Sequence, residues 1–299
     1  MATLAQWIEG ARPRTLPAAV APVAVGTGAA FALRGTHGHE DAGHWGFALL
    51  ALVVALALQV GVNYANDYSD GIRGTDEERI GPVRLVGQRL APPQQVKAAA
   101  FSAFALAGLA GIALSVLSGH WWMLLVGAAA VWAAWNYTGG KNPYGYRGLG
   151  EVAVFVFFGL VAVLGTQLTQ AGTTSWAGLA GAVGTGAVAA TLNLTNNLRD
   201  IEGDAAVGKV TLAVRLGARR TRRLYAGLIG LAFLMVLASG LQHTPAVVAL
   251  LALPLAVPPV RAVLQRARGR ALIGVLGQTG RMQLVLGLLW GLGLWWAGR

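Results

Sequence analysis

Nine long apolar segments dominate this chain and limit what it can fold into. Each is close to the length of about 20 residues with which an α-helix crosses the hydrocarbon core of a bilayer. Backbone polar groups cannot stay unpaired in lipid, so such segments form membrane-spanning helices. We therefore predict an all-α, polytopic membrane protein whose residues 1–299 form a single transmembrane domain. The segments fall at about 15–33, 45–66, 97–117, 120–138, 150–170, 176–197, 224–241, 244–260 and 282–298.

The charged residues indicate how these helices are oriented. They make up only 12% of the chain, and 21 of the 23 lysine and arginine residues lie before the first segment or in loops that precede odd-numbered segments. Basic residues of membrane proteins concentrate in cytoplasmic loops. We therefore predict a multi-pass protein of the plasma membrane with its N-terminus and these loops in the cytoplasm. The formal net charge of +11 is explained in this way, and no nucleic-acid partner is predicted.

A polar motif follows the second apolar segment and recurs 130 residues later. The first copy reads Asn63-Tyr-Ala-Asn66-Asp67-Tyr-Ser-Asp70, and the second reads Asn193-Leu-Thr-Asn196-Asn197-Leu-Arg-Asp200. Three positions of each copy share one face of a helix. Because the offset spans four segments, we predict two tandem four-helix repeats, about 12–140 and 141–265, and a final helix at about 282–298. The two motifs would then face each other across a central cavity.

Both motifs are rich in hard oxygen ligands, which are the ligands that magnesium prefers. Ionisable residues near the membrane are costly, so two copies at one offset favour a metal site over carboxylates that only neutralise arginines. Asp67 and Asn197 hold equivalent places and could instead cap helix ends. The candidate metal ligands are Asp67, Asp70, Asp76, Asn196, Asp200 and Asp204.

Basic and tyrosine side chains accompany the motifs in the cytoplasmic loops. Arginine binds phosphate through two parallel hydrogen bonds, and lysine binds it as a point charge. A single basic residue in these loops can also serve only to set the orientation of the protein in the membrane. Tyr137 and Tyr146 can stabilise a cation by their ring faces or belong to an interfacial aromatic belt. The basic run at 219–223 is interpreted as an anchor for lipid headgroups. Lys209 follows the second motif at the offset at which Arg79 follows the first.

These motifs resemble those of the UbiA superfamily of intramembrane prenyltransferases. The finer signatures Arg12-Pro-Arg14-Thr-Leu-Pro, Gly81-Pro-Val-Arg84-Leu and Pro143-Tyr-Gly-Tyr146-Arg-Gly-Leu-Gly-Glu151 are similar to those of its actinobacterial members that use 1,4-dihydroxy-2-naphthoate. The resemblance covers nearly the whole chain. One departure is that position 74 is Gly where the superfamily often has the last Asp of the first motif, and the acid is Asp76 here.

The resemblance implies transfer of a polyprenyl group from its diphosphate to 1,4-dihydroxy-2-naphthoate, with decarboxylation, to give demethylmenaquinone. It implies Mg²⁺ as cofactor, with Mn²⁺ as a substitute, and the lipid bilayer as surroundings, and it implies no particular oligomeric state. The catalytic residues it implies are Asn66, Asp70, Asp200, Asp204, Lys141 and Tyr137. The substrate-binding residues it implies are Arg14, Asn63, Arg73, Arg79, Arg84, Tyr146, Arg147, Asn193, Asn196 and Lys209.

Two other functions remain open at this point. Another branch of the same superfamily would use 4-hydroxybenzoate or haem as the acceptor. Tandem repeats around an acidic cavity are also found in cation-coupled transporters, whose sites usually lie near the bilayer midplane. Here the carboxylates lie at the cytoplasmic ends of helices among arginines, which favours the enzyme.

Overall fold

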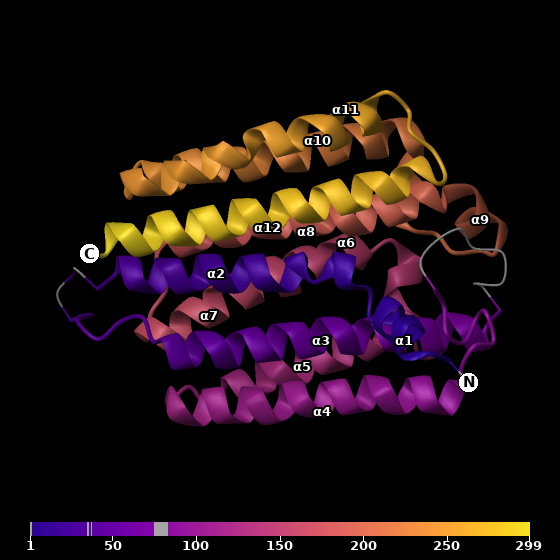
Figure 1. Ribbon diagram of the computed structural model, residues 1–299, viewed down its shortest axis with the longest axis horizontal. Coiled ribbons are helices and arrows are strands. Elements are labelled where there is room, and N and C mark those ends of the chain that lie inside the picture. Colours follow the sequence, from indigo (N-terminus) through magenta and orange to yellow (C-terminus); the bar gives the residue numbers. More distant parts are fainter. Residues whose placement is uncertain (1, 35, 37, 75–82) are drawn as a thin grey trace.

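The computed structural model of the chain describes residues 2–34, 36, 38–74 and 83–299, and no strand occurs among them. The long helices lie side by side along the longest axis of the molecule (Figure 1). They are α2 (Pro17–Ala32), α3 (Trp45–Ile72), α4 (Pro93–Leu117), α5 (Met123–Asn136), the continuous α6 (Gly150–Phe155), η3 (Val156–Val161) and α7 (Ala162–Ala171), α8 (Trp176–Arg199), α10 (Leu212–Gly240), η4 (Thr244–Ala252) with α11 (Leu253–Leu264), and α12 (Ala271–Ala297). The short helices α1 (Leu4–Gly10) and η1 (Pro13–Thr15) precede α2, and η2 (Tyr144–Arg147) and α9 (Ile201–Ala206) lie in loops between long helices.

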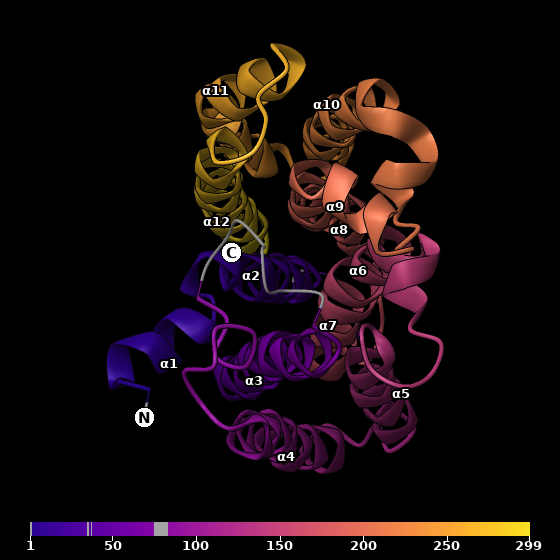
Figure 2. The ribbon, with the colours of Figure 1, turned by 90° about the vertical axis from the view of Figure 1, so that its right-hand side faces the viewer.

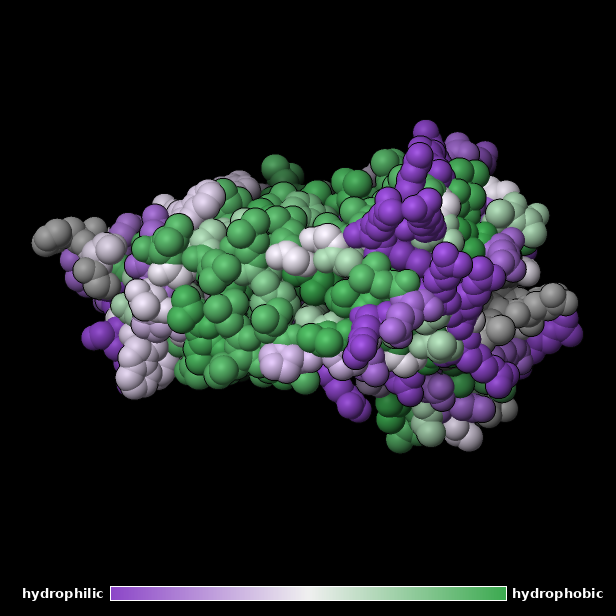
Figure 3. Space-filling model, turned by 90° about the horizontal axis from the view of Figure 1, so that it is seen from above, coloured by the Kyte–Doolittle hydropathy of each residue, from purple (hydrophilic) through white to green (hydrophobic). Residues whose placement is uncertain are grey.

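Each of the nine apolar segments forms a helix, as predicted. Within the described part of the chain, seven helices are long and apolar enough to cross a membrane, and the bent pair formed by residues 4–15 and α2 makes an eighth. The remaining segment corresponds to the shorter helix α5, with 14 residues. Figure 3 shows the hydrophobic residues as a band across the middle of the molecule, with hydrophilic residues gathered mainly at one end. The protein is therefore a multi-pass membrane protein.

Two predicted boundaries were wrong in the same direction. The seventh helix begins at Leu212 instead of about 224, with a kink at Gly217 (φ 72°) that separates its first residues from the rest, and the ninth begins at Ala271 instead of about 282. The added part of α10, residues 212–223, carries five arginines, which hide a helix from a search for apolar segments. The added part of α12, residues 271–281, is mostly apolar, and Leu272 and Val275 in it are buried, so this helix was simply predicted too short. The run at 219–223 consequently lies inside α10.

Arg222 also corrects the interpretation of this run as a headgroup anchor. Its side chain is buried, and its Nη1 donates hydrogen bonds to the carbonyl oxygens of Val263 and Ala267, each at 2.9 Å. Carbonyls at the C-terminal end of a helix lack partners within the helix, so Arg222 caps the end of α11. Arg219, Arg220 and Arg223 are exposed, as an anchor requires.

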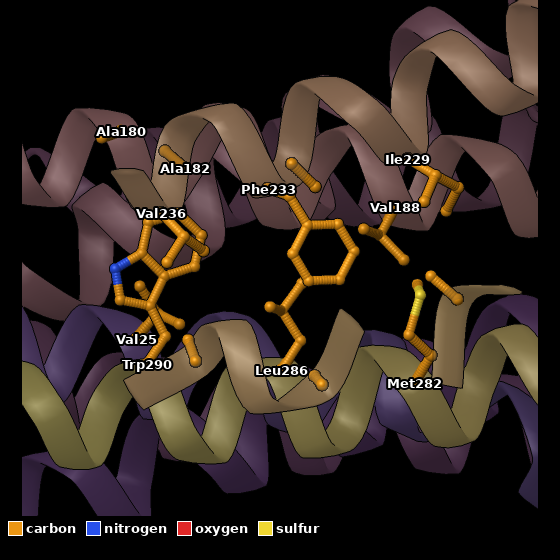
Figure 4. Packing of buried hydrophobic residues seen from close by; sticks show 14 of the residues in the cluster. Val25, Ala180, Ala182, Val188, Ile229, Phe233, Val236, Met282, Leu286 and Trp290 are labelled. Atoms are coloured by element: carbon orange, nitrogen blue, oxygen red, sulfur yellow. The ribbon is translucent and has the colours of Figure 1, made fainter. Parts of the chain in front are cut away.

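The main core lies between α8, α10, α12 and α2. The side chains of Phe233 and Leu286 point toward each other there (Figure 4). Trp290 is fully buried, and its Nε1 donates a hydrogen bond to Ser239 Oγ at 3.2 Å. Membrane helices pack through close contact of small residues. At Gly287 and Gly291 of α12, a Cβ atom would overlap α2. This packing holds α8, which carries the second motif, in a fixed position.

The helices are arranged on two sides of α2. The end-on view in Figure 2 shows α3, α4 and α5 on one side of α2, and α8, α10, α11 and α12 on the other. The second and third helices of each half form close pairs, α3 with α4 and α8 with α10. The division into halves at about 140 and 265 stays a prediction that these equivalent pairs favour.

Candidate functional site

Two cavities meet where α3 and α8 end. A polar cavity of about 580 Å³ lies among the ends of these helices, the N-terminal segment and η2. An apolar cavity of about 850 Å³ lies between α2, α3, α4, α5, α6–α7 and α8. The residues that line both cavities are Arg12, Thr15, Asn66, Tyr137, Leu192, Asn193 and Asn196.

The first motif supplies two side chains to the polar cavity. Asn66 Oδ1 accepts a hydrogen bond from Thr138 Oγ1 at 2.8 Å, and Asp70 Oδ1 accepts one from Tyr146 Oη at 2.8 Å. Asp70 lies in the last turn of α3 and is 2% exposed. The C-terminal end of a helix carries a partial negative charge, which disfavours a carboxylate. Cations near Asp70 are therefore needed to stabilise it.

Tyr146 connects the two motifs. Its hydroxyl holds Asp70, the guanidinium of Arg73 lies 5.5 Å from the centre of its ring, and Lys209 Nζ lies 4.7 Å from that centre. Lys209 Nζ is also 3.7 Å from Asp204 Oδ1. A cation over an aromatic face is stabilised by the ring. One tyrosine thus brings a carboxylate of the first motif and a lysine after the second motif into one cluster.

The second motif presents amides and an arginine to the cavity. Asn196, Asn197 and Arg199 line it, whereas Asp200 and Asp204 lie beside its lining. Arg199 binds Asp200 with two hydrogen bonds of 2.7 and 2.8 Å. The Nη1 atom of Arg199 is buried without a partner among the described residues. A bidentate pair of this kind leaves Arg199 oriented and still able to bind another anion.

Asp67 has a structural position instead of a place in the cavity. It is 1% exposed, and its two carboxylate oxygens accept hydrogen bonds from the backbone N–H of Leu85 at 2.7 Å and of Val86 at 3.2 Å. These bonds hold the turn that carries Arg84, which lines the polar cavity. The geometry favours the interpretation of Asp67 as an anchor over its interpretation as a metal ligand.

We expect the substitution Asp67→Ala to destabilise the protein by about 3 kcal/mol, because it leaves two buried N–H groups unpaired. Thermal unfolding of the purified protein measures the change, and Glu202→Ala, at an exposed position, is the control. Unchanged stability together with lost magnesium affinity would restore Asp67 as a ligand.

The other predicted site residues divide into four groups. Arg14 lines the polar cavity and Asn63 the apolar one. Arg73 donates to the carbonyl oxygens of Thr138 and Gly140, outside the cavity lining. Lys141 and Arg147 are exposed and line neither cavity. Asp76 and Arg79 lie outside the described residues.

Sequence reasoning missed three residues of this region. Arg12 lines both cavities, in a left-handed backbone conformation with φ of 55°. Arg199 directly precedes Asp200, and from the sequence it counts only as one of the basic residues that indicate membrane topology. Glu151 is 5% exposed and its Oε1 accepts a hydrogen bond from Asn197 Nδ2 at 2.7 Å. Glu151 carried a usable signal, since it is an acid at the start of an apolar segment.

Two tyrosines, Tyr137 and Tyr144, line the apolar cavity near the polar one. Tyr144 donates to the carbonyl oxygen of Ala133 at 2.9 Å and packs edge-on against Tyr137, with ring centres 5.5 Å apart. Burial raises the pKa of Tyr144 to about 12. Both rings line the apolar cavity, so they offer aromatic surface there.

The donor set of the polar cavity fits magnesium. Asn66, Asp70, Asn196 and Asn197 present hard oxygen atoms, and magnesium usually completes its shell with water or substrate phosphates. Among the described residues, no three Asp, Glu, His or Cys side chains group together as a metal site. Oxygen atoms from a bound anion would therefore be needed to complete the coordination.

Together these features define an all-helical intramembrane protein with paired Asn/Asp motifs at the mouth of an apolar cavity. The chain belongs to the UbiA prenyltransferase family, whose family model matches residues 19–273. The resemblance seen in the sequence is thereby confirmed.

Individual relatives agree with this assignment. The chain is 56% identical over 288 residues to the 1,4-dihydroxy-2-naphthoate octaprenyltransferase of Mycobacterium tuberculosis, with 96% of each chain covered. It is 38% identical over 298 residues to the enzyme of the same name from Escherichia coli, covering 96% of this chain and 94% of that one. The structure of a UbiA homolog from Archaeoglobus fulgidus bound to GPP and Mg²⁺ shares the fold, with a TM-score of 0.68, 15% identity, and 97% and 99% of the two chains covered.

Proposed function

We propose that the protein transfers a polyprenyl group from polyprenyl diphosphate to 1,4-dihydroxy-2-naphthoate, with loss of the carboxylate as carbon dioxide. The product is demethylmenaquinone, an intermediate of menaquinone biosynthesis. The observation that carries this proposal is the meeting of a polar, cation-lined cavity with a larger apolar one. Such a pair of cavities matches a substrate with an anionic head and a hydrocarbon tail. The names of the relatives at 56% and 38% identity support the acceptor.

The cations of the polar cavity would bind the diphosphate. Arg14, Arg84, Arg199 and Lys209 all line it, and arginine binds phosphate oxygens in a bidentate fashion. The archaeal homolog bound to GPP and Mg²⁺ supports a role for magnesium here. Magnesium would supply charge neutralisation for the leaving diphosphate. Asn66, Asp70, Asn196 and Asn197 line the cavity and would hold it, with Asp200 and Asp204 beside the lining as further candidate ligands.

The apolar cavity would hold the prenyl tail and protect the reaction from water. Departure of the diphosphate leaves an allylic cation at C1, which the electron-rich naphthoate ring attacks. Water would compete for this cation, so a dry cavity is required. Tyr137, Phe157 and Phe158 line it and offer aromatic faces to the cation. The tail would extend along α4 and α5 towards the lipid.

Product analysis tests the proposed function. The purified protein is incubated with a polyprenyl diphosphate, magnesium and 1,4-dihydroxy-2-naphthoate, and the products are identified by mass spectrometry. We expect demethylmenaquinone and one carbon dioxide per turnover. Prenylation of 4-hydroxybenzoate or haem instead would assign another branch of the family. Magnesium-dependent ion flux in liposomes without any prenylated product would favour a transporter.

We also propose that the polar cavity faces the cytoplasm and that the protein lies in the plasma membrane. The chain has no cysteine, so single cysteines report on topology directly. Cysteines at the exposed positions Gln88 and Ala205 should react with a membrane-impermeant thiol reagent only from the cytoplasmic side, and a cysteine at the exposed Thr36 only from outside. Labelling of Gln88 and Ala205 variants from opposite sides would contradict this orientation.

A further inference from the structure

Two equivalent asparagines of the repeats differ in their hydrogen bonding. In the first repeat, Asn63 Nδ2 donates to Ala11 O at 2.9 Å and to Thr15 Oγ1 at 3.0 Å, and its Oδ1 accepts from Gln59 Nε2 at 3.2 Å. In the second repeat, Asn193 Oδ1 accepts from Tyr137 Oη at 2.8 Å. The Asn193 Nδ2 atom is buried and has no partner among the described residues. Asn63 is satisfied by the protein, whereas Asn193 retains a free donor.

Asn193 lies at the place where the two cavities meet. It lines the polar cavity and the apolar cavity, as does Tyr137. Gly150 makes room for this pair, because a Cβ atom there would be 2.9 Å from both Asn193 Nδ2 and Tyr137 Oη. A buried N–H group gains stability from a hydrogen-bond acceptor, so the amide nitrogen of Asn193 is available to an acceptor atom in the cavities.

The substrate atom expected at this junction is the ester oxygen. With the diphosphate among the cations and the tail in the apolar cavity, the oxygen that joins them lies between the two. Charged groups of the polar cavity would bind the terminal phosphate oxygens. A neutral donor at the boundary suits the ester oxygen, which carries little charge until its bond to carbon breaks.

We propose that Asn193 Nδ2 donates a hydrogen bond to the ester oxygen of the prenyl diphosphate. This rests on the proposed function, since it requires a prenyl diphosphate in the two cavities. As the C1–O bond breaks, both electrons stay on this oxygen, which becomes a terminal oxygen of the released diphosphate. C1 becomes the allylic cation, and the amide keeps its proton throughout. The hydrogen bond therefore strengthens as charge develops, which makes Asn193 a catalytic residue.

An atom exchange in the ligand tests this contact. We compare geranyl diphosphate with geranyl S-thiolodiphosphate, in which a sulfur atom, a weak hydrogen-bond acceptor, replaces the ester oxygen. Equilibrium binding is measured with magnesium and without an aromatic acceptor. The wild-type protein should prefer the oxygen compound by about fivefold, which corresponds to one ordinary hydrogen bond. In Asn193→Leu the preference should disappear, and turnover should fall by about a hundredfold with a much smaller change in KM.

Two further variants keep the test decisive. Gly150→Ala crowds the amide without removing it and should also reduce the preference for oxygen, which covers the case that Asn193→Leu does not fold. Asn63→Leu, at the equivalent position, should retain the wild-type preference even if it binds both ligands more weakly. An oxygen preference that persists in both Asn193→Leu and Gly150→Ala would overturn the assignment of Asn193. Failure of the wild-type protein to bind either ligand would instead overturn the proposed function.

Discussion

Replacing Asp70 by asparagine is expected to reduce the rate of prenyl transfer by about a hundredfold or more. The substitution keeps the shape of the side chain and removes a negative charge from a site for a hard cation. Asp70 is buried in the last turn of α3, and its contact with Tyr146 can survive in the variant because the amide oxygen still accepts. The loss should therefore report the missing charge and not a rearranged loop. Asp200→Asn should have an effect of the same size.

Glu202→Gln is the matched control for these variants. Glu202 lies in α9 between Asp200 and Asp204, and it is exposed. All three variants lose one carboxylate at the same end of the molecule, so a general change of electrostatic field affects them alike. Steady-state rates at equal expression are compared. If Glu202→Gln lowers the rate as much as Asp70→Asn, the acids act only through their summed negative charge, and their assignment as metal ligands is wrong.

Removal of divalent metal is expected to abolish turnover altogether. Asp200 and Asp204 pair with Arg199 and Lys209, cations that only partly replace a divalent ion, and a departing diphosphate needs more charge than they supply. Excess chelator should therefore stop product formation, and added Mg²⁺ or Mn²⁺ should restore it. Calcium, which prefers more ligands at longer distances, should restore less.

Thermal unfolding in the presence of chelator distinguishes a metal needed for catalysis from a metal needed for folding. The thermal unfolding temperature should change little in chelator, because the core between α8, α10 and α12 contains no predicted ligand. Full activity in chelator, with the same product, would eliminate the metal site. A large loss of stability would show that the metal is structural.

The sequence predicted the spans well because each is long and nearly free of charge. Asn66, Asp70 and Asn196 all line the polar cavity, and the helical spacing of their motifs could indicate this; their roles in catalysis and metal binding stay predictions. The sequence did not distinguish Asp67 from Asp70, because both are acids within one turn of each other. Their different surroundings depend on the turn at 83–91, which comes from a distant part of the chain.

Contacts between residues that are far apart in the sequence could not be predicted either, because they also depend on how distant parts of the chain pack together. Tyr146 lies 76 residues from Asp70, and Tyr137 lies 56 residues from Asn193. No local pattern encodes which tyrosine binds which polar partner. Lys141 and Arg147 were predicted to belong to the site from their neighbourhood in the sequence, yet they are exposed and line neither cavity. Their roles in substrate binding stay predictions.

The shortness of α5 bears on the depth in the membrane at which the proposed reaction would take place. Its 14 residues rise about 21 Å, which is about 9 Å less than the hydrocarbon thickness of a typical bilayer. Exposed Trp121 and Trp122 precede it, and tryptophan side chains favour the membrane–water interface. With that end fixed at the interface, the shortfall comes at the other end, beside Tyr137. We therefore expect the boundary between the cavities to lie below the level of the lipid headgroups, at a depth where a carbocation meets few water molecules.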